Sequence, residues 1–126
     1  MYQHKVLLID DSELTLQVVG EVLARAGYDV RSSTELVDFS TAFGEWRPDI
    51  ILTDVNMPGV SGVELCRRLK SSYDTAHVPV VLYSALGSED LEVLARECEA
   101  DAFLSKQDEL EALPRALELL IETSLF

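Results

Sequence analysis

The feature that most constrains the fold of this chain is a fivefold alternation between short apolar runs and longer amphipathic segments. The apolar runs cover residues 6–9, 28–31, 50–52, 78–83 and 102–104. The amphipathic segments cover residues 12–26, 34–45, a stretch that begins at 61, 88–99 and the leucine-rich end of the chain. Continuous apolar runs are typical of strands covered on both faces, and apolar spacings of three and four are typical of helices. The pattern predicts an α/β fold, with five parallel strands in one doubly wound sheet and five helices.

Residues at the ends of these segments predict where several helices begin and end. The first helix is expected to end at Gly27, because glycine readily adopts the conformation that closes helices. Its candidate core face, at a spacing of four, comprises Leu14, Val18, Val22 and Ala26. Ser61 and Glu64 form a capping-box pattern that predicts the start of the third helix. Pro114 leaves two starts open for the last helix, an early one capped within residues 108–111 and a later one near 113.

Length and charge indicate a single acidic domain over residues 1–126. A chain of 126 residues that is 48% hydrophobic suits one domain with its own core. No apolar run approaches the roughly 18 residues of a membrane helix and no signal-peptide core is present, so we expect a cytoplasmic protein without membrane contact. The net charge of −13 argues against nucleic-acid binding through this domain. The chain ends soon after the last expected helix, which fits both a single-domain protein and the first domain of a longer one.

Cysteine and histidine do not suggest a further site. Cys66 and Cys98 lie among apolar helix residues without metal-binding spacing, so we expect buried thiols. His4 and His77 are isolated in the sequence, and we expect structural or solvated side chains at both positions.

Polar residues follow the predicted strands in a pattern that points to function. They are Asp10 and Asp11 after the first strand, Asp54 after the third, Ser84, which precedes Ala85, after the fourth, and Ser105 and Lys106 after the fifth. In an open parallel sheet the carboxyl ends of the strands share one edge, and ligands bind there. We therefore expect three carboxylates, a hydroxyl group and a lysine to meet at one edge of the sheet.

This set of side chains suits a divalent cation and a phosphoryl group. Clustered carboxylates repel one another, and Mg²⁺ relieves the repulsion while leaving coordination positions for a phosphoryl oxygen. The expected ligands are Asp11, Asp54, the backbone carbonyl of Asn56 and, through water, Asp10. Lys106 and Ser84 suit phosphate oxygens, and a carboxylate beside the metal can act as the nucleophile. The arrangement matches phosphoryl transfer, where positioning and charge stabilisation do most of the catalysis.

Each of these residues also has an ordinary structural explanation when it is taken alone. Asp10 or Asp11 could cap the first helix, Ser84 and Asp54 could be turn residues, and Lys106 could be a solvated surface charge. The functional interpretation depends on all of them meeting at one place.

The chain resembles the receiver domains of bacterial two-component signalling from about residue 5 to residue 121. The segments that carry the resemblance are VLLIDDS at 6–12, PDIILTDVNMPG at 48–59, VVLYSA at 80–85 and ADAFLSK at 100–106. An Asp-Asp pair alone is weak evidence, whereas four such segments in this order and spacing are specific. The resemblance implies a flavodoxin-like sheet of order 2-1-3-4-5 and a signalling switch that is not an enzyme.

The resemblance also assigns roles at the expected site. Asp54 resembles the phosphoacceptor, supplied by a histidine kinase or a histidine phosphotransfer protein. Asp10 and Asp11 resemble the acidic pair that holds Mg²⁺, and the side chains of Ser84 and Lys106, with the Ala85 N–H, resemble the groups that bind the phosphoryl oxygens. Phe103 matches the aromatic switch position, for which ordinary core packing is the alternative. Movement of Ser84 and Phe103 is expected to reshape the surface of the fourth helix, fifth strand and fifth helix, which a downstream output domain or protein would recognise.

Two residues depart from the family pattern. Gln107 stands where the family usually has a proline in a cis bond, and we expect a trans bond because a cis bond without proline costs roughly 2.5–4 kcal/mol. Ser61 stands where Asp is frequent, which gives the following helix a neutral cap.

Two other functions compete with the phosphorylated switch. A pseudo-receiver would keep the fold and bind partners without phosphorylation, and the complete set of site residues disfavours it. A phosphatase of the haloacid dehalogenase type would also use an Asp nucleophile with Mg²⁺. That family has a second Asp two residues after the nucleophile, where this chain has Asn56.

Overall fold

The structure is a computed structural model that describes residues 3–34, 46–55, 61–73 and 75–124. Its strands are β1 (Lys5–Ile9), β2 (Asp29–Ser33), β3 (Ile50–Thr53), β4 (Val80–Ser84) and β5 (Ala102–Ser105). Its helices are α1 (Glu13–Arg25), α3 (Gly62–Ser71), α4 (Ser88–Cys98), the short 3-10 helix η1 (Leu110–Ala112) and α5 (Leu113–Ser124). All strands are parallel, in the order β2-β1-β3-β4-β5, which confirms the predicted sheet. The helix predicted over 34–45 lies, from residue 35 onward, outside the described residues.

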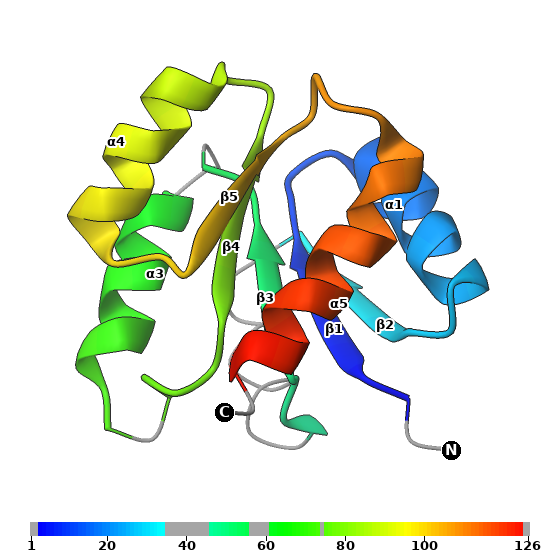
Figure 1. Ribbon diagram of the computed structural model, residues 1–126, viewed down its shortest axis with the longest axis horizontal. Helices are drawn as coiled ribbons and strands as arrows, with labels where there is room; N and C mark the ends of the chain where they lie inside the picture. The colour runs from blue at the N-terminus through cyan, green and yellow to red at the C-terminus, as the bar shows by residue number, and fades with distance from the viewer. Residues whose placement is uncertain (1–2, 35–45, 56–60, 74, 125–126) are drawn as a thin grey trace.

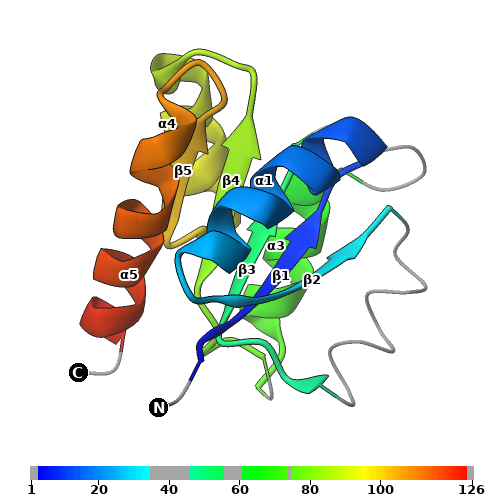
Figure 2. The ribbon, with the colours of Figure 1, turned by 90° about the vertical axis from the view of Figure 1, so that its right-hand side faces the viewer.

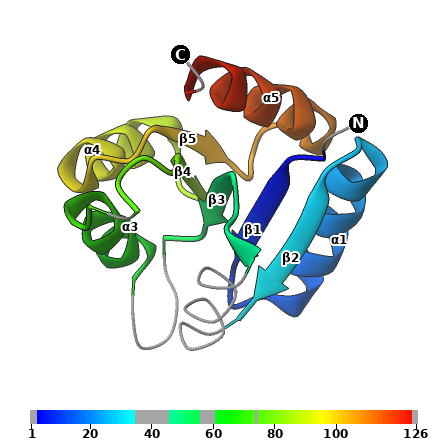
Figure 3. The same cartoon turned by 90° about the horizontal axis from the view of Figure 1, so that it is seen from below.

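Helices cover both faces of the sheet. Figures 1 and 3 show α1 and α5 on one face and α3 and α4 on the other. Ile51 packs into the core beneath α3 and α4, whereas Ile50 and Leu52 pack into the core beneath α1 and α5. Successive strand residues therefore serve opposite cores, which is why the strand sequences are continuously apolar. The strands point away from the end of the sheet where β1 begins and α5 ends (Figure 2).

The buried face of α1 differs from the predicted one. Leu16, Val19 and Leu23 are buried, whereas Leu14 is 71% exposed and Val18 is 40% exposed. The prediction followed a strict spacing of four, but an α-helix turns once every 3.6 residues. A stripe with that spacing drifts around the helix, and in α1 it begins on the solvent side.

The predicted helix ends agree with the structure where it describes them. Gly27, just beyond α1, has a φ of +101°, which glycine adopts without steric cost. The Ser61 hydroxyl accepts a hydrogen bond from the Glu64 N–H at 3.1 Å and caps α3. The later start is correct for α5, so Pro114 lies in its first turn, where an N–H group has no helical acceptor.

Each strand differs from its predicted run by one or two residues at one or both ends, and the differences are largest in β4 and β2. β4 begins at Val80 and not at residue 78, because Pro79 has no N–H group for the ladder. β2 runs to Ser33 and not to residue 31, because its polar end still pairs with Ile9 of β1.

Cysteine and histidine positions agree with their predicted structural roles. Cys66 of α3 and Cys98 of α4 are buried free thiols, and the Cys66 thiol donates to the Cys98 carbonyl at 3.4 Å. Burial raises the pKa of the Cys66 thiol, which keeps it protonated. His77 is exposed, and His4 Nδ1 lies 3.7 Å from Asp49 Oδ2.

Candidate functional site

The strand register brings the predicted polar residues to one edge of the sheet. Ile9 of β1 lies opposite Thr53 of β3, so the next residue of each strand, Asp10 and Asp54, is brought to the same edge. The Asp54 N–H donates to the Ile9 carbonyl at 2.9 Å and extends this pairing. At the carboxyl ends of the neighbouring pair β4 and β5, the Lys106 N–H donates to the Ser84 carbonyl at 2.7 Å.

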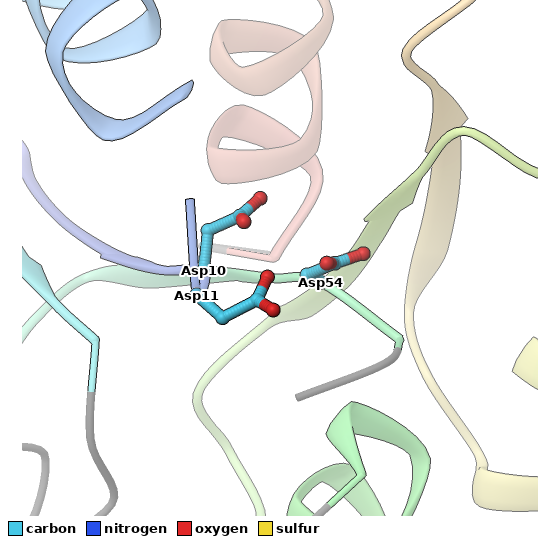
Figure 4. A group of neighbouring side chains, drawn as sticks. All are labelled: Asp10, Asp11 and Asp54. Carbon is cyan, nitrogen blue, oxygen red and sulfur yellow. The ribbon is translucent and has the colours of Figure 1, made fainter. Parts of the chain in front are cut away.

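Three carboxylates gather at this edge, as Figure 4 shows for Asp10, Asp11 and Asp54. One oxygen from each lies within 4.8 Å of the others. Asp10 is almost completely buried, Asp54 is partly buried and Asp11 is exposed. The cluster is therefore open to solvent on the Asp11 side, where a hydrated cation could approach.

Lys106 supplies positive charge to the cluster. Its Nζ lies 2.6 Å from Asp10 Oδ2 and 3.8 Å from Asp54 Oδ2. The lysine thus bridges two carboxylates that would otherwise repel each other. Its Nζ also lies 5.7 Å from the centre of the Tyr83 ring, within the range of a cation–π contact.

Backbone N–H groups fix the other oxygens of the two inner carboxylates. Asp10 Oδ1 accepts a hydrogen bond from the Ser12 N–H at 2.9 Å, and Asp54 Oδ1 accepts one from the Val55 N–H at 2.8 Å. The cap of α1 is Ser12, whose hydroxyl accepts from the Thr15 N–H. Helix capping, the ordinary explanation for Asp10, is therefore supplied by another residue.

Burial and the neighbouring charges change the ionisation of Asp54. Burial raises the pKa of its carboxyl group above the ordinary value, and the charges of Asp10 and Asp11 raise it further. Lys106 and the Val55 N–H lower the pKa, but they do not cancel the rise. A site with this excess of negative charge favours a divalent cation.

Ser84 and Phe103, the two residues expected to act as a switch, lie on the neighbouring strands β4 and β5. Ser84 is buried, and its hydroxyl accepts from the Leu86 N–H at 3.3 Å, which is a turn contact. Phe103 lies opposite Leu82 and packs, partly buried, against the core beneath α3 and α4. The predicted ligand Asn56 lies outside the described residues. The Lys106–Gln107 bond is trans, as expected, since the described residues contain no cis peptide bond.

Sequence reasoning missed two residues that shape the site. Tyr83 is buried beside Lys106, and burial together with Asp10 and Asp108 raises the pKa of its hydroxyl. Gly62 lies against the Asp54 carbonyl, where a Cβ atom would lie 1.8 Å from the oxygen. The sequence signal available for the contact between Gly62 and Asp54 was a glycine directly after the Ser61 cap. No sequence signal shows that the Tyr83 ring faces Lys106.

A search for membrane-spanning segments in the described residues found no helix with the necessary length and apolarity.

Comparison with known proteins gives consistent matches. A family profile described as "Response regulator receiver domain" matches residues 6–118. The phosphate regulon transcriptional regulatory protein PhoB of Pseudomonas aeruginosa is 32% identical over 80% of this chain, which spans 44% of PhoB. The polar-differentiation response regulator DivK of Brucella anthropi is 30% identical, with 91% of each chain covered. The structure of the chemotaxis response regulator CheY4 of Vibrio cholerae superposes with a TM-score of 0.84 at 26% identity, covering 94% of this chain and 99% of that one.

The family profile covers most of the chain, and the relatives agree with it. The strand order and the cluster of Asp10, Asp11 and Asp54 agree with the expectation from the sequence motifs. This chain belongs to the response regulator receiver domain family.

Proposed function

We propose that this chain is a phosphoacceptor switch of a two-component phosphorelay and that Asp54 receives the phosphoryl group. The observation that carries the proposal is the position of Asp54, whose carboxylate lies within 4.8 Å of Asp10 and Asp11 and 3.8 Å from Lys106. The donor is a histidine kinase or a histidine phosphotransfer protein, and the receiver is not an enzyme beyond assisting its own phosphorylation and dephosphorylation. A cytoplasmic location follows from such a donor.

The acidic cluster fits Mg²⁺, because the ion prefers carboxylate and carbonyl oxygens and retains several waters. Asp11, Asp54 and the backbone carbonyl of Asn56 would hold it, and Asp10 would act through a bound water. When bound, the ion supplies charge neutralisation for the carboxylates and the incoming phosphoryl oxygens.

In the transfer step, a carboxylate oxygen of Asp54 attacks the phosphorus of the phosphohistidine. The new P–O bond gives an acyl phosphate as the P–N bond breaks, and the electron pair leaves with the imidazole nitrogen. The Val55 N–H holds Asp54 Oδ1 during this step. Lys106, which is already 3.8 Å from Asp54 Oδ2, pairs with a phosphoryl oxygen, and the Ser84 hydroxyl and the Ala85 N–H donate to the others.

The acyl phosphate changes the conformation because it adds charge at a fixed position. Ser84 gives up its contact with the Leu86 N–H, turns toward the phosphoryl group and leaves space for Phe103. The surface of α4, β5 and α5 then changes shape and is recognised by a downstream output domain or protein. Full conversion between two states requires about 5.5 kcal/mol of differential interaction. The net charge of −13 argues against a nucleic acid as the partner of this domain.

Intact mass spectrometry after incubation with Mg²⁺ and acetyl phosphate tests this proposal. We expect the wild type to gain one phosphate and Asp54→Asn to gain none. Asp90→Asn, an exposed position on α4, serves as the control and should behave like the wild type. No gain in the wild type, together with unchanged partner binding by Asp54→Asn, would favour the pseudo-receiver. Continuous turnover of unrelated phosphate esters would favour the phosphatase.

A further inference from the structure

The turn after β4 is bound to the turn after β5 through three consecutive carbonyl groups. The Lys106 N–H donates to the Ser84 carbonyl at 2.7 Å, and Gln107 Nε2 donates to the Ala85 carbonyl at 2.8 Å. The Ser105 hydroxyl donates to the Leu86 carbonyl at 3.0 Å. Both connections lie at the same edge of the sheet, beside the carboxyl ends of β4 and β5 (Figure 1). Movement of one turn therefore requires the other turn to move or these bonds to break.

Gln107 contributes to this link with both its side chain and its backbone. Its amide nitrogen must be the group that faces Ala85, because a carbonyl oxygen can pair only with a donor. Its backbone N–H donates to Ser105 Oγ at 3.1 Å, and the Ser105 hydroxyl in turn donates to Leu86. A proline at position 107 would supply neither bond, since it has no N–H and no amide side chain.

The restrained turn contains groups that must reach a phosphoryl group on Asp54. The Ser84 hydroxyl accepts from the Leu86 N–H at 3.3 Å, so it is engaged within its own turn. In the proposed switch this turn shifts as Ser84 and the Ala85 N–H approach a phosphoryl group on Asp54, and the bond from Gln107 to the Ala85 carbonyl opposes that shift.

We propose that Gln107 is a positioning residue that holds the β4–α4 turn in the conformation without a phosphoryl group. The inference rests on the proposed function, because the turn must move when Asp54 is phosphorylated. Gln107 is exposed, so water competes for its hydrogen bond and the contribution is modest. Loss of one such bond shifts a two-state equilibrium by about two- to fivefold.

The test measures binding of beryllofluoride, a stable mimic of the phosphoryl group, in the presence of Mg²⁺. Titrations of the whole chain are followed by ¹H–¹⁵N NMR for the wild type, Gln107→Ala and Gln107→Met. Methionine keeps the length of glutamine without a donor, which separates the hydrogen bond from side-chain bulk. Gln17→Ala, at an exposed position of α1, is the matched control.

We expect both Gln107 variants to bind the mimic about two- to fivefold more tightly than the wild type and Gln17→Ala, with unchanged affinity for Mg²⁺ alone. Affinity for the mimic that is equal to or weaker than the wild type in both variants would overturn the inference. Asp54→Asn separates the two proposals. If the wild type binds and Asp54→Asn does not, the proposed function stands and the Gln107 variants decide the inference. If the wild type does not bind, both proposals fail.

Discussion

At the scale of single residues, Gly62 shows how closely α3 approaches Asp54, the proposed phosphoacceptor. A Cβ atom at this position would lie 1.8 Å from the Asp54 carbonyl oxygen and 2.8 Å from the carbonyl carbon. The Gly62 N–H donates to the Val55 carbonyl at 2.8 Å, which holds the start of the helix against the site. Both contacts are with backbone atoms, so a larger residue cannot be accommodated by a side-chain rotation.

We expect Gly62→Ala to lower the free energy of unfolding by about 1–3 kcal/mol, because the backbone at Asp54 must shift. Urea unfolding followed by circular dichroism measures the change. Gly20→Ala is the matched control, since a Cβ there meets nothing within 4 Å. That substitution should stabilise α1 by about 0.5–1 kcal/mol. Equal effects of the two substitutions would contradict the proposed contact.

The carboxyl group of Asp54 should make stability depend on pH. Its pKa is raised mainly by burial, so the charged form is disfavoured in the folded state relative to the unfolded state. The resulting destabilisation is absent below the unfolded pKa, grows as pH rises and is complete above the folded pKa. Without divalent cations, Asp54→Asn should therefore be more stable than the wild type at pH 7. The difference should narrow as pH falls toward the ordinary value of 3.8.

Urea unfolding in EDTA across a pH series measures this difference. Asp90→Asn is the control for loss of one exposed carboxylate and should not stabilise the protein. A wild type that is more stable than Asp54→Asn at pH 7 in EDTA would contradict the unfavourable charge assigned to Asp54.

At the scale of elements, Lys70 fastens α3 to the amino end of β4. Its Nζ donates to the Val78 carbonyl at 2.8 Å and lies 2.5 Å from Asp101 Oδ2. The same carboxylate oxygen accepts the Val80 N–H at 2.8 Å. Only 9% of the Lys70 side chain is exposed, so loss of its amino group would leave the carbonyl of the buried Val78 without this donor and Asp101 without its positive partner.

We expect Lys70→Met to lower the free energy of unfolding by about 1.5–3 kcal/mol, measured by urea unfolding. Phosphorylation of Asp54 by acetyl phosphate should continue, because Lys70 lies at the opposite end of the sheet. Arg68→Met is the control, since Arg68 forms an exposed pair with Glu64 at 3.2 Å that is worth about 1 kcal/mol or less. Equal losses in both variants would show that the Lys70 contacts are no stronger than a surface ion pair.

The elements themselves could be predicted from the sequence because their patterns are local. The continuous apolar runs predicted the strands. Gly27 and Ser61 predicted helix ends, because the interactions that end or cap a helix join residues only a few positions apart in the sequence. The prediction of the buried face of α1 was wrong, because a spacing of four residues does not match the 3.6 residues of a helical turn. The contact of Lys70 with Asp101 could not be predicted, since it joins residues 31 positions apart through the packing of α3.

At the scale of the whole molecule, the net charge of −13 opposes compaction. Salt should therefore raise the urea midpoint of the wild type modestly by screening this repulsion. MgCl₂ at matched ionic strength should raise the midpoint further, because it should increase the free energy of unfolding by about 2.7 kcal/mol at a concentration of 100 times the Kd. Asp11→Asn should lose this additional stabilisation and keep the effect of NaCl. Equal stabilisation by NaCl and MgCl₂ would contradict a specific cation site.

The site followed from the sequence as far as topology determines it. Parallel strands place their carboxyl ends at one edge, which is why Asp10, Asp54 and Lys106 could be expected to meet. The ring of Tyr83 and the amide of Gln107 make contacts that depend on packing between strands and turns, which no short motif encodes. The backbone contact of Gly62 depends on how α3 packs against Asp54, and its only sequence signal was a glycine after the Ser61 cap. These three residues were therefore missed, or in the case of Gln107 were recognised only as a departure from the family pattern.

The most direct test is to locate the phosphoryl group after transfer. Borohydride reduces an acyl phosphate to an alcohol, which converts a phosphorylated Asp into homoserine that tandem mass spectrometry can identify. After treatment with Mg²⁺ and acetyl phosphate, we predict homoserine at Asp54 and at no other acidic residue. Homoserine at Asp10 or Asp11, or its absence from the whole chain, would contradict the assignment of Asp54 as the phosphoacceptor.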